Sequence, residues 1–364
     1  MGHEANIRRV AARSYRIPTD APEADGTIAW SATTLVVAEI DAAGETGLGY
    51  SYASAAAAEI VNKELAPIVV EQDAFAIPAL WLAMVQAVRN IGWRGVCACA
   101  ISAMDVALWD LKARLLNIPL VDLFGRERRE VPIYGSGGFT SYSEARLCEQ
   151  LSGWVEQEGC HFVKMKVGAA PAQDLARVRS ARAAISAAEL YVDANGAYRR
   201  KQALEFAQQF ASLGVTRFEE PVSSDDLEGL RLVRDRAPAS IEIAAGEYGY
   251  EPFYFRRMLE AGAVDVLQAD ATRCGGYTGF LKAAALADAW NLPLSAHTAP
   301  SLHLPVCCSA PRLRDIEWFY DHVRIERMVF DGVPRPRNGA IAPDPARPGH
   351  GLTFKERDAE RLAA

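Results

Sequence analysis

From residue 131 onward, short apolar runs alternate with segments of helical periodicity, and this alternation constrains the fold more than any other feature of the chain. Such alternation is typical of repeated strand and helix units that build a parallel sheet. Eight runs indicate that the sheet closes into a barrel. The runs are residues 131–135, 162–167, 190–193, 216–219, 241–245, 264–268, 293–297 and 316–319.

A doubly wound open sheet would fit the same alternation, but it usually carries a glycine-rich phosphate loop after its first strand. Residues 135–138 read Gly-Ser-Gly-Gly, which is not the GxGxxG pattern followed by a helix. We therefore favour a closed α/β barrel.

The first 125 residues have a different pattern, which we interpret as two strands followed by helices. The β-rich stretches are 35–40 and 47–52, and the helical stretches are 56–70, 79–89 and 97–116. The last helix is apolar enough to be buried between two domains. The tail, rich in Pro, Arg and Gly, is expected to pack back along the N-terminal domain. The predicted domains are a cap at 1–125, a barrel at 126–325 and a C-terminal segment at 326–364.

Composition narrows the possible partners. A net charge of −7 and a pI near 5.5 argue against nucleic acid and favour a small-molecule ligand. No stretch approaches the roughly 18 consecutive apolar residues of a membrane-spanning helix, and the N-terminus does not resemble a signal sequence. The seven cysteines lack the paired CxxC spacing of a zinc site, so free, mostly buried thiols are expected. These features predict a cytoplasmic protein without membrane association.

A reactive side chain stands at the end of nearly every apolar run after the first. From Lys166 onward, successive members are 20 to 28 residues apart, close to the length of one strand, loop and helix. Active sites of parallel barrels lie at the C-terminal ends of the strands, so these side chains are predicted to meet at one mouth. The set is Lys164, Lys166, Asp193, Glu219, Glu247, Asp270, His297 and Glu317.

Three members of this set, Asp193, Glu219 and Glu247, are carboxylates from successive units. Carboxylates brought together repel one another unless a cation neutralises them, and oxygen-only ligands are what Mg²⁺ prefers. The sequence therefore predicts an Mg²⁺ site. Asn195 points to the same side as Asp193 if the strand continues, and it could hold a ligand or substrate, although a turn position is equally compatible.

Lys164 and Lys166 are two residues apart in a strand, so both point to one face. We expect their mutual repulsion and the nearby metal to lower the pKa of one lysine, which would let it act as a base near neutral pH.

His297 and Asp270 end adjacent strands, so the carboxylate can hold one ring nitrogen and orient the other as an acid or base. Glu317 can remain protonated in a low-dielectric pocket and donate a hydrogen bond to an enolic oxygen. His161, His322 and His350 are interpreted as structural, and His303 as a possible pocket-lining residue.

With these residues in place, the chain resembles the mandelate racemase subgroup of the enolase superfamily. The resemblance covers essentially the whole chain, including the helix MDVALWDLKAR at 104–114. The motifs are VKMKVG with the two lysines, YVDANGAY with Asp193, FEEPV with Glu219, IAAGE with Glu247, LQADATRCGG with Asp270, SAHT with His297 and DIEWF with Glu317.

The resemblance implies an N-terminal α+β capping domain, a (β/α)7β modified TIM barrel and one Mg²⁺. It also implies a common first step, removal of the proton alpha to a carboxylate to give a metal-bound enediolate, and a homo-oligomer. By their motifs, Asp193, Glu219 and Glu247 match the metal ligands. Lys166, tuned by Lys164, matches the base on one face, His297 with Asp270 the acid/base on the other, and Glu317 the acid that hydrogen-bonds the intermediate.

The reaction that follows the first step is less constrained. Loops of the capping domain, here about 16–30 and 49–53, would determine specificity, and they offer Arg16, Trp30 and Tyr52 as substrate-binding residues together with Asn195 of the barrel. Because such polar loops suit hydroxyl groups, we favour dehydration of a sugar acid or diacid to a 2-keto-3-deoxy acid. Racemisation or epimerisation of a 2-hydroxy acid and cycloisomerisation of a sugar-acid lactone remain alternatives.

Two other protein classes fit less well. A barrel that binds a metal without catalysis would be expected to lack a member of the set, and every member is present. An aldolase or hydrolase barrel would need a Schiff-base lysine or a His-rich metal site, whereas this cluster is all carboxylate with a lysine pair beside it.

Overall fold

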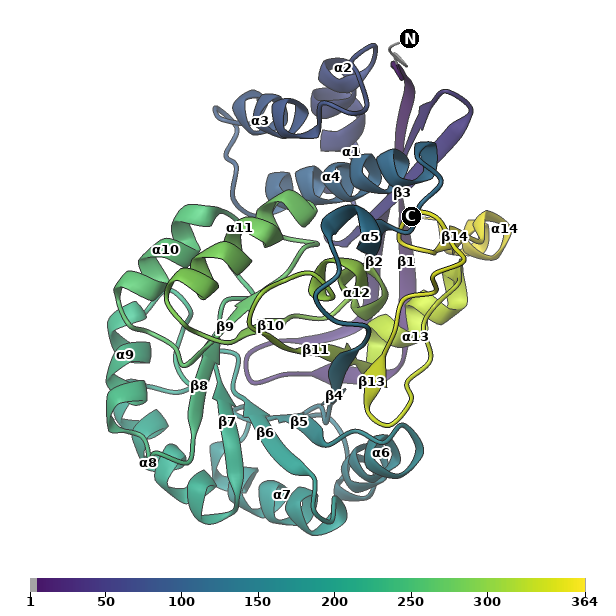
Figure 1. Cartoon of the computed structure of the whole chain (residues 1–364). Coiled ribbons are helices and arrows are strands. Elements are labelled where there is room, and N and C mark those ends of the chain that lie inside the picture. The colour runs from purple at the N-terminus through teal and green to yellow at the C-terminus, as the bar shows by residue number, and fades with distance from the viewer. Residues whose placement is uncertain (1–4, 364) are drawn as a thin grey trace.

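Eight parallel strands form a closed barrel in the computed structural model, which describes residues 5–363 (Figure 1). The strands follow one another around the sheet in chain order, and pairing of the last with the first closes it. The predicted parallel barrel is confirmed. Its strands are β4 (Val131–Gly137), β5 (Phe162–Lys166), β6 (Glu189–Asp193), β7 (Val215–Glu219), β8 (Glu242–Ala245), β9 (Val266–Ala269), β10 (Leu294–Ala296) and β11 (Leu313–Phe319).

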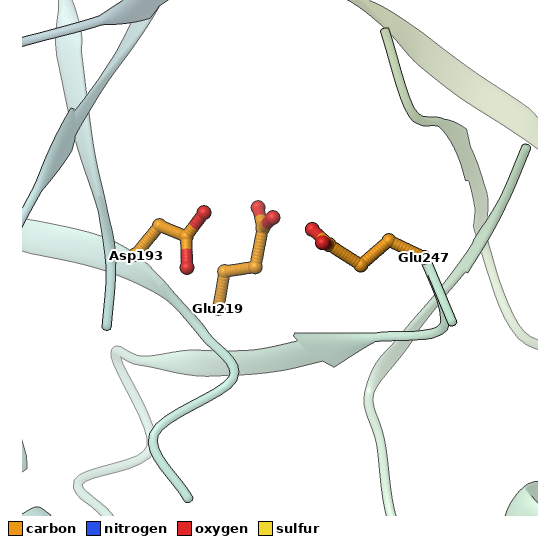
Figure 2. Close-up of side chains that lie close together, drawn as sticks. All are labelled: Asp193, Glu219 and Glu247. Atoms are coloured by element: carbon orange, nitrogen blue, oxygen red, sulfur yellow. The ribbon is translucent and has the colours of Figure 1, made fainter. Parts of the chain in front are cut away.

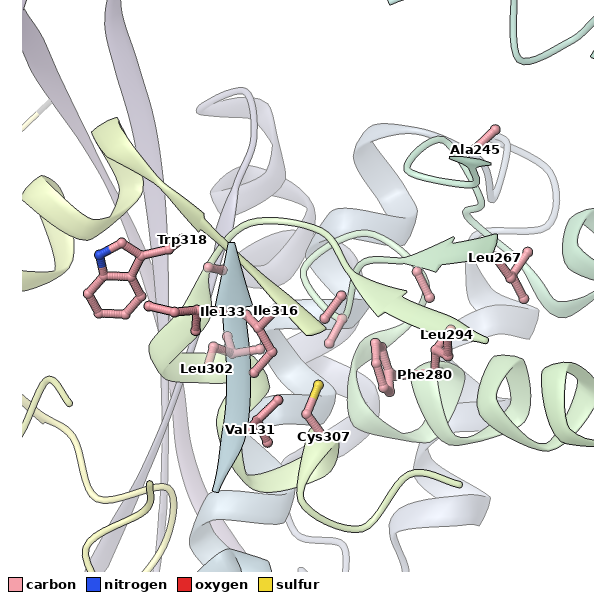
Figure 3. Packing of buried hydrophobic residues seen from close by; sticks show 14 of the residues in the cluster. Val131, Ile133, Ala245, Leu267, Phe280, Leu294, Leu302, Cys307, Ile316 and Trp318 are labelled. Atoms are coloured by element: carbon pink, nitrogen blue, oxygen red, sulfur yellow. The ribbon is translucent and has the colours of Figure 1, made fainter. Parts of the chain in front are cut away.

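Seven helices connect these strands and cover the outside of the barrel, which gives the (β/α)7β order. Figure 3 shows how Phe280 and Leu302 on two of the helices pack toward Leu294 and Ile316 on the strands. The connecting helices are α6 (Glu144–Gln157), α7 (Pro171–Ala184), α8 (Arg200–Ser212), α9 (Leu227–Arg236), α10 (Pro252–Glu260), α11 (Gly276–Ala289) and α12 (Pro300–Cys307).

The N-terminal part is an α+β cap with three antiparallel strands, β1 (Ile7–Ala24), β2 (Ala29–Ala42) and β3 (Glu45–Tyr52). The sequence predicted only two strands and a loop at 16–30, so β1 is a correction. Polar residues interrupt the apolar pattern of β1, and backbone pairing with β2, such as Arg16 opposite Thr34, holds it in the sheet.

Helices pack on this sheet and connect the cap to the barrel. The longest, α4, is almost entirely buried, as predicted, and contacts both β3 and α11. Asp105 of α4 accepts hydrogen bonds from the backbone N–H and the hydroxyl of Thr278 at 2.9 and 2.6 Å. The helical elements are α1 (Ala56–Ile60), the π-helical turn η1 (Val61–Leu65), α2 (Ala66–Val69), α3 (Ile77–Ala87), α4 (Val96–Leu115) and α5 (Leu120–Phe124).

The C-terminal segment contacts both the cap and the barrel. The Phe354 ring lies 5.5 Å from the Tyr15 ring of the cap, and His350 Nε2 lies 2.8 Å from the carbonyl oxygen of Leu48. Its elements are α13 (Tyr320–Val329), β12 (Phe330–Asp331), β13 (Ala340–Ile341), which pairs with β4, β14 (Thr353–Phe354), α14 (Glu356–Ala359) and the 3-10 turn η2 (Glu360–Leu362).

The hairpin that joins β1 to β2 reaches the barrel mouth. Gly26 lies so close to the barrel that a Cβ atom there would come within 2.3 Å of the carbonyl oxygen of Ala194 and 2.6 Å of that of Val167. Thr140 of the barrel donates its backbone N–H to the carbonyl oxygen of Ala24 at 2.8 Å. The hairpin therefore covers the ends of β5 and β6.

The cysteines and the helix lengths can be compared directly with the sequence predictions. Six of the seven cysteines are buried free thiols, and Cys148 is partly exposed. Within residues 5–363, none of the helices has both the length and the apolarity to cross a membrane.

Candidate active site

The strand register brings the predicted reactive residues to one level of the barrel. Lys166 of β5 is paired with Asp193 of β6, and Asp193 is paired with Glu219 of β7. Because neighbouring parallel strands present paired residues side by side, these three side chains meet at the C-terminal end of the sheet.

Glu247 reaches the same place through a glycine. Gly246, which follows β8, has φ +139°, and a Cβ atom there would lie 2.0 Å from the carbonyl oxygen of Gln268. Only glycine adopts this backbone turn without strain and also fits so closely against β9. The turn directs Glu247 into the mouth beside the two other acids.

The three predicted ligands lie together and are buried. One carboxylate oxygen of each of Asp193, Glu219 and Glu247 lies within 4.8 Å of the others. Figure 2 shows the three carboxylates pointing toward one common point. The arrangement provides an oxygen-only, tri-anionic cradle for a divalent cation.

Buried oxygen atoms without donors support this interpretation. Among the described residues, Glu219 Oε1 and Asn195 Oδ1 are buried and make no hydrogen bond to the protein. A buried acceptor without a donor costs about 1–3 kcal/mol, and a cation removes that cost. The residues present therefore fit the Mg²⁺ predicted from the sequence.

The mouth also contains more acid than base. Glu220, next to Glu219, is buried, and burial together with Glu247 and Asp193 raises its pKa well above the ordinary value. Burial and Asp193 likewise raise the pKa of Glu219. Six buried carboxyl groups face three basic side chains, so a divalent cation would restore much of the balance. The acids are Asp193, Glu219, Glu220, Glu247, Asp270 and Glu317, and the bases are Lys164, Lys166 and Arg273.

The protein's own groups do not lower the pKa of either lysine, and the part of the prediction that depends on Mg²⁺ stays a prediction. Lys164 Nζ lies 2.7 Å from Glu219 and 2.8 Å from Glu317, and Lys166 Nζ lies 2.5 Å from Asp193. Burial alone would lower both pKa values, but these carboxylates outweigh burial and the repulsion between the lysines, and both pKa values lie above the usual range.

His297 and Asp270 lie side by side, as the positions of their strands predicted. His297 Nδ1 lies 2.8 Å from Asp270 Oδ2, and Nε2 lies 3.3 Å from Glu247 Oε2. Burial would raise the pKa of Asp270, but the hydrogen bond from His297 and the electrostatic attraction of His297, Arg273 and His303 together outweigh burial, and the pKa lies below the ordinary range. His303 does not line the cavity: its Nε2 accepts the Ala271 N–H at 2.7 Å and so supports the loop after Asp270.

Glu317 lies at the mouth, but its surroundings do not favour the protonated form that we expected. Burial raises its pKa, and the nearby Lys164, His297 and Lys166 more than reverse this effect, so the pKa lies below its ordinary value. Ser136 and the backbone N–H of Thr298 also donate to its carboxylate, at 2.5 and 3.1 Å. The expectation overlooked these donors, which come from β4 and from the loop after β10.

A cavity of about 250 Å³ lies between these groups and the cap. Three of the four predicted substrate-binding residues, Trp30, Tyr52 and Asn195, line it. Arg16 does not: it lies exposed on β1 between the buried Tyr15 and Ile17, because successive strand residues point to opposite faces. The structure therefore does not bring Arg16 to the site.

Two lining residues were not identified from the sequence. Arg273 lies at the mouth, where Nη1 donates to the carbonyl oxygen of Glu247 at 3.1 Å and Nε lies 3.5 Å from Asp270. His322, interpreted as structural, lines the cavity and stacks on Tyr52 with ring centroids 3.4 Å apart. Arg273 follows Asp270 by three residues and could have been found as part of a strand-end loop, whereas no local signal marks His322.

This fold and site define an enzyme with a (β/α)7β barrel, a divalent-metal centre and acid/base groups on both sides of it. Comparisons with known proteins support this class of enzyme. Residues 10–125 match the family described as the mandelate racemase / muconate lactonizing enzyme N-terminal domain, and residues 146–359 match the enolase C-terminal domain-like family. The chain belongs to the mandelate racemase / muconate lactonizing enzyme family of the enolase superfamily.

Among similar solved structures, one is a mandelate racemase/muconate lactonizing enzyme-like protein from Rubrobacter xylanophilus. It is 49% identical with a TM-score of 0.96, and the match covers 99% of this chain and 100% of that one. Another is a racemase from Streptomyces coelicolor with bound magnesium, 32% identical with a TM-score of 0.92 over 98% of this chain and 100% of that one.

Two similar characterised proteins have different activities. A 3,6-anhydro-alpha-L-galactonate cycloisomerase from Streptomyces coelicolor is 34% identical over 98% of both chains. An arabinonate dehydratase from Saccharolobus solfataricus is 29% identical over 88% of both chains. The family is therefore established, and the overall reaction has to be argued from the site.

Proposed function

We propose that this protein is an Mg²⁺-dependent enzyme that removes the proton alpha to the carboxylate of a sugar acid and dehydrates the resulting enediolate to a 2-keto-3-deoxy acid. The observation that carries the proposal is the placement of two acid/base groups at opposite ends of the ligand triad. Lys166 contacts Asp193 at 2.5 Å, and His297 Nε2 lies 3.3 Å from Glu247.

Asp193, Glu219 and Glu247 would hold the metal. When bound, Mg²⁺ supplies positive charge that stabilises the carboxylate-derived oxygens of the substrate as negative charge develops on them. Lys164 contacts both Glu219 and Glu317 and so fixes the wall beside the triad.

The chain's own residues then move two protons. Lys166, in its neutral form, takes the α-proton, and the electron pair of the broken C–H bond moves onto the carboxylate. The electron pair then returns to form a C=C bond between the α- and β-carbons as the C–O bond at the β-carbon breaks, and the departing hydroxide takes a proton from the His297 imidazolium and leaves as water. The resulting enol gains a proton at the β-carbon and loses its hydroxyl proton, which gives the 2-keto-3-deoxy acid. Asp270 holds His297 Nδ1 and so keeps Nε2 available for this transfer. The configuration of the substrate decides which of the two groups serves as base.

Dehydration is favoured by the polar cavity lining, which suits a substrate with several hydroxyl groups. The similarity to an arabinonate dehydratase supports the same choice. Cycloisomerisation of a sugar-acid lactone is the second candidate, because the similar 3,6-anhydro-alpha-L-galactonate cycloisomerase matches almost the whole chain. Racemisation would use the same two groups without loss of a hydroxide.

The test is incubation of the Mg²⁺-loaded protein with a library of sugar acids, with semicarbazide detection of 2-keto acids. Formation of a 2-keto-3-deoxy acid is expected. If deuterium enters the α-carbon in D₂O but no 2-keto acid forms, the reaction is racemisation or cycloisomerisation and not dehydration.

His297→Asn with its matched control His161→Asn sharpens this test. Loss of His297 is expected to slow product formation by about 10²–10⁴-fold, the usual contribution of a general acid or base, whereas the exposed His161 has no such role. Full activity of the His297 variant would contradict the proposed mechanism, as would the absence of α-exchange with every acid in the library.

A further inference from the structure

The cavity has a wall on the cap side that differs chemically from the barrel mouth. We define this cap-side wall as Ile28, Trp30, Ala32, Thr33 and Tyr52 of the cap with Phe319 and His322 of the barrel domain, all of which line the cavity. Trp30 and Phe319 both pack edge-on against Phe139, which connects the two parts of the wall. A substrate carboxylate at the metal ligands would direct its far end toward this wall.

The cap-side wall offers no positive charge to a ligand. Among the lining side chains that the structure describes, Lys166 and Arg273 are the lysine and arginine, and the acid/base residue His297 lies beside Glu247. Lys166 contacts Asp193, and Arg273 contacts Glu247 and Asp270, so both belong to the acidic mouth. A second carboxylate placed against the wall would lose hydration without gaining a charged partner, which is costly.

The wall does offer a neutral hydrogen-bond donor. His322 Nδ1 accepts the backbone N–H of Ala299 at 3.4 Å, so the ring proton lies on Nε2. Tyr52 covers one face of the imidazole at an interplanar angle of 11°. The polar group of His322 that remains for a ligand is therefore its Nε2–H.

The size of the cavity restricts the ligand as well. At about 250 Å³ it is smaller than the roughly 300–1,000 Å³ of sites that hold drug-sized ligands. A single small sugar acid fits this space better than an extended or conjugated one.

From this charge pattern we infer that the site selects monocarboxylates with an uncharged, hydroxylated far end over diacids, and that His322 is a specificity-determining residue that donates to a hydroxyl of that end. This inference rests on the proposed function and narrows its substrate class. The sugar-acid relatives alone do not decide between the two kinds of acid.

The experiment compares acids that differ only at the last carbon. Binding of D-gluconate and D-glucarate, and of D-galactonate and galactarate, to the Mg²⁺-loaded protein is measured by calorimetry, and α-exchange of each in D₂O is measured by NMR. At least one monoacid is expected to bind about 10-fold or more tightly than its diacid, a difference of the size expected for an unpaired buried charge. Equal or tighter binding of the diacids, or no binding in either pair, would overturn the inference.

The two readouts separate the inference from the proposed function. Preferential binding of a monoacid without α-exchange of any acid would contradict the proposed reaction and leave the specificity inference intact. Fast α-exchange together with tighter binding of a diacid would support the proposed reaction and contradict the specificity inference.

Two variants test the wall directly. His322→Phe keeps an aromatic ring against Tyr52 but removes the donor, and it should weaken binding of the preferred monoacid by about 2–10-fold, the range of one hydrogen bond. It should not weaken binding of the short 2-hydroxy acid lactate, and the control His161→Phe should change neither. Ala32→Arg adds a cation to the wall and should shift the preference toward the diacid. Unchanged preference in both folded variants would overturn the role of the wall.

Discussion

Two polar clusters occupy the inside of the same barrel, and they are built on the same strands. Arg217 and Asp315 each stand two residues before a member of the mouth, Glu219 and Glu317, and therefore point to the same inner face one step deeper. In the deep cluster Arg217 and Asp315 form a fully buried ion pair at 3.0 Å, and Ser295 donates to Asp315 at 2.5 Å.

The difference between the two clusters lies in their charge balance. The deep cluster pairs one cation with one anion, and the Arg217 guanidinium also lies over the Tyr191 ring at 4.2 Å. The mouth brings six acids against three bases and leaves carboxylate oxygens without donors. A cluster that neutralises itself supports the fold, whereas an unbalanced one needs a ligand. Three predictions test that contrast, and a fourth concerns a buried acid where the cap meets the barrel.

The largest effect is expected at the mouth from Lys166→Met. Because Lys166 is the proposed acid/base group next to Asp193, its loss should reduce turnover by about 10³-fold or more without unfolding the barrel. Turnover and α-exchange are measured beside the control Lys201→Met, an exposed lysine on α8. If the Lys166→Met variant keeps its turnover and its α-exchange, Lys166 is not the acid/base group.

In the deep cluster the expected effect is on stability. Arg217→Met leaves Asp315 buried without its partner and should lower the free energy of unfolding by about 3–5 kcal/mol. The double variant Arg217→Met/Asp315→Leu removes both charges and should regain most of that loss, as measured by urea unfolding. If the double variant is as unstable as the single one, the pair is not the source of the effect.

Metal binding should stabilise the mouth and leave the deep cluster unaffected. Mg²⁺ at 100 times its Kd should raise the free energy of unfolding by about 2.7 kcal/mol. Glu219→Gln, which replaces one predicted ligand, should abolish this gain, whereas Ser295→Ala in the deep cluster should retain it. Equal Mg²⁺ stabilisation of the wild type and Glu219→Gln would contradict the assigned ligand set.

The smallest effect is expected from a single acid at the contact between cap and barrel. Glu23 is buried, and one of its oxygens accepts from Trp30 Nε1 at 2.9 Å while the other finds no donor within residues 5–363. Burial, with a smaller contribution from Asp321, raises its pKa from 4.5 to about 8. The folded protein therefore holds a proton that the unfolded chain releases, and the stability from this group is full below pH 4.5 and is lost as pH rises through 8.

Glu23→Gln should remove this pH dependence. The variant should gain about 1–3 kcal/mol relative to the wild type between pH 6 and pH 9, the cost of a poorly satisfied buried polar group. Urea unfolding at the two pH values measures the change, with the exposed Glu45→Gln as control. A constant difference between wild type and variant would show that Glu23 does not titrate in this range.

Much of the mouth could be predicted because the barrel repeats. Asp193, Glu219 and Glu247 each end or follow a strand, and a parallel barrel brings all strand ends to one side, so sequence position alone predicted their meeting. The same reasoning placed His297 beside Asp270. The conformation of β1 could not be predicted in this way, because its polar residues hide the alternation that pairing with β2 imposes.

What the sequence by itself determined is the order of strands and the type of group at each strand end, since both depend on local periodicity. Only the tertiary structure decided the charge state favoured for Lys166 and Glu317 and the presence of His322 in the cavity. Those properties depend on distances between segments far apart in the chain, such as Tyr52 and His322, and electrostatic and stacking energies follow those distances rather than the spacing of residues in the sequence.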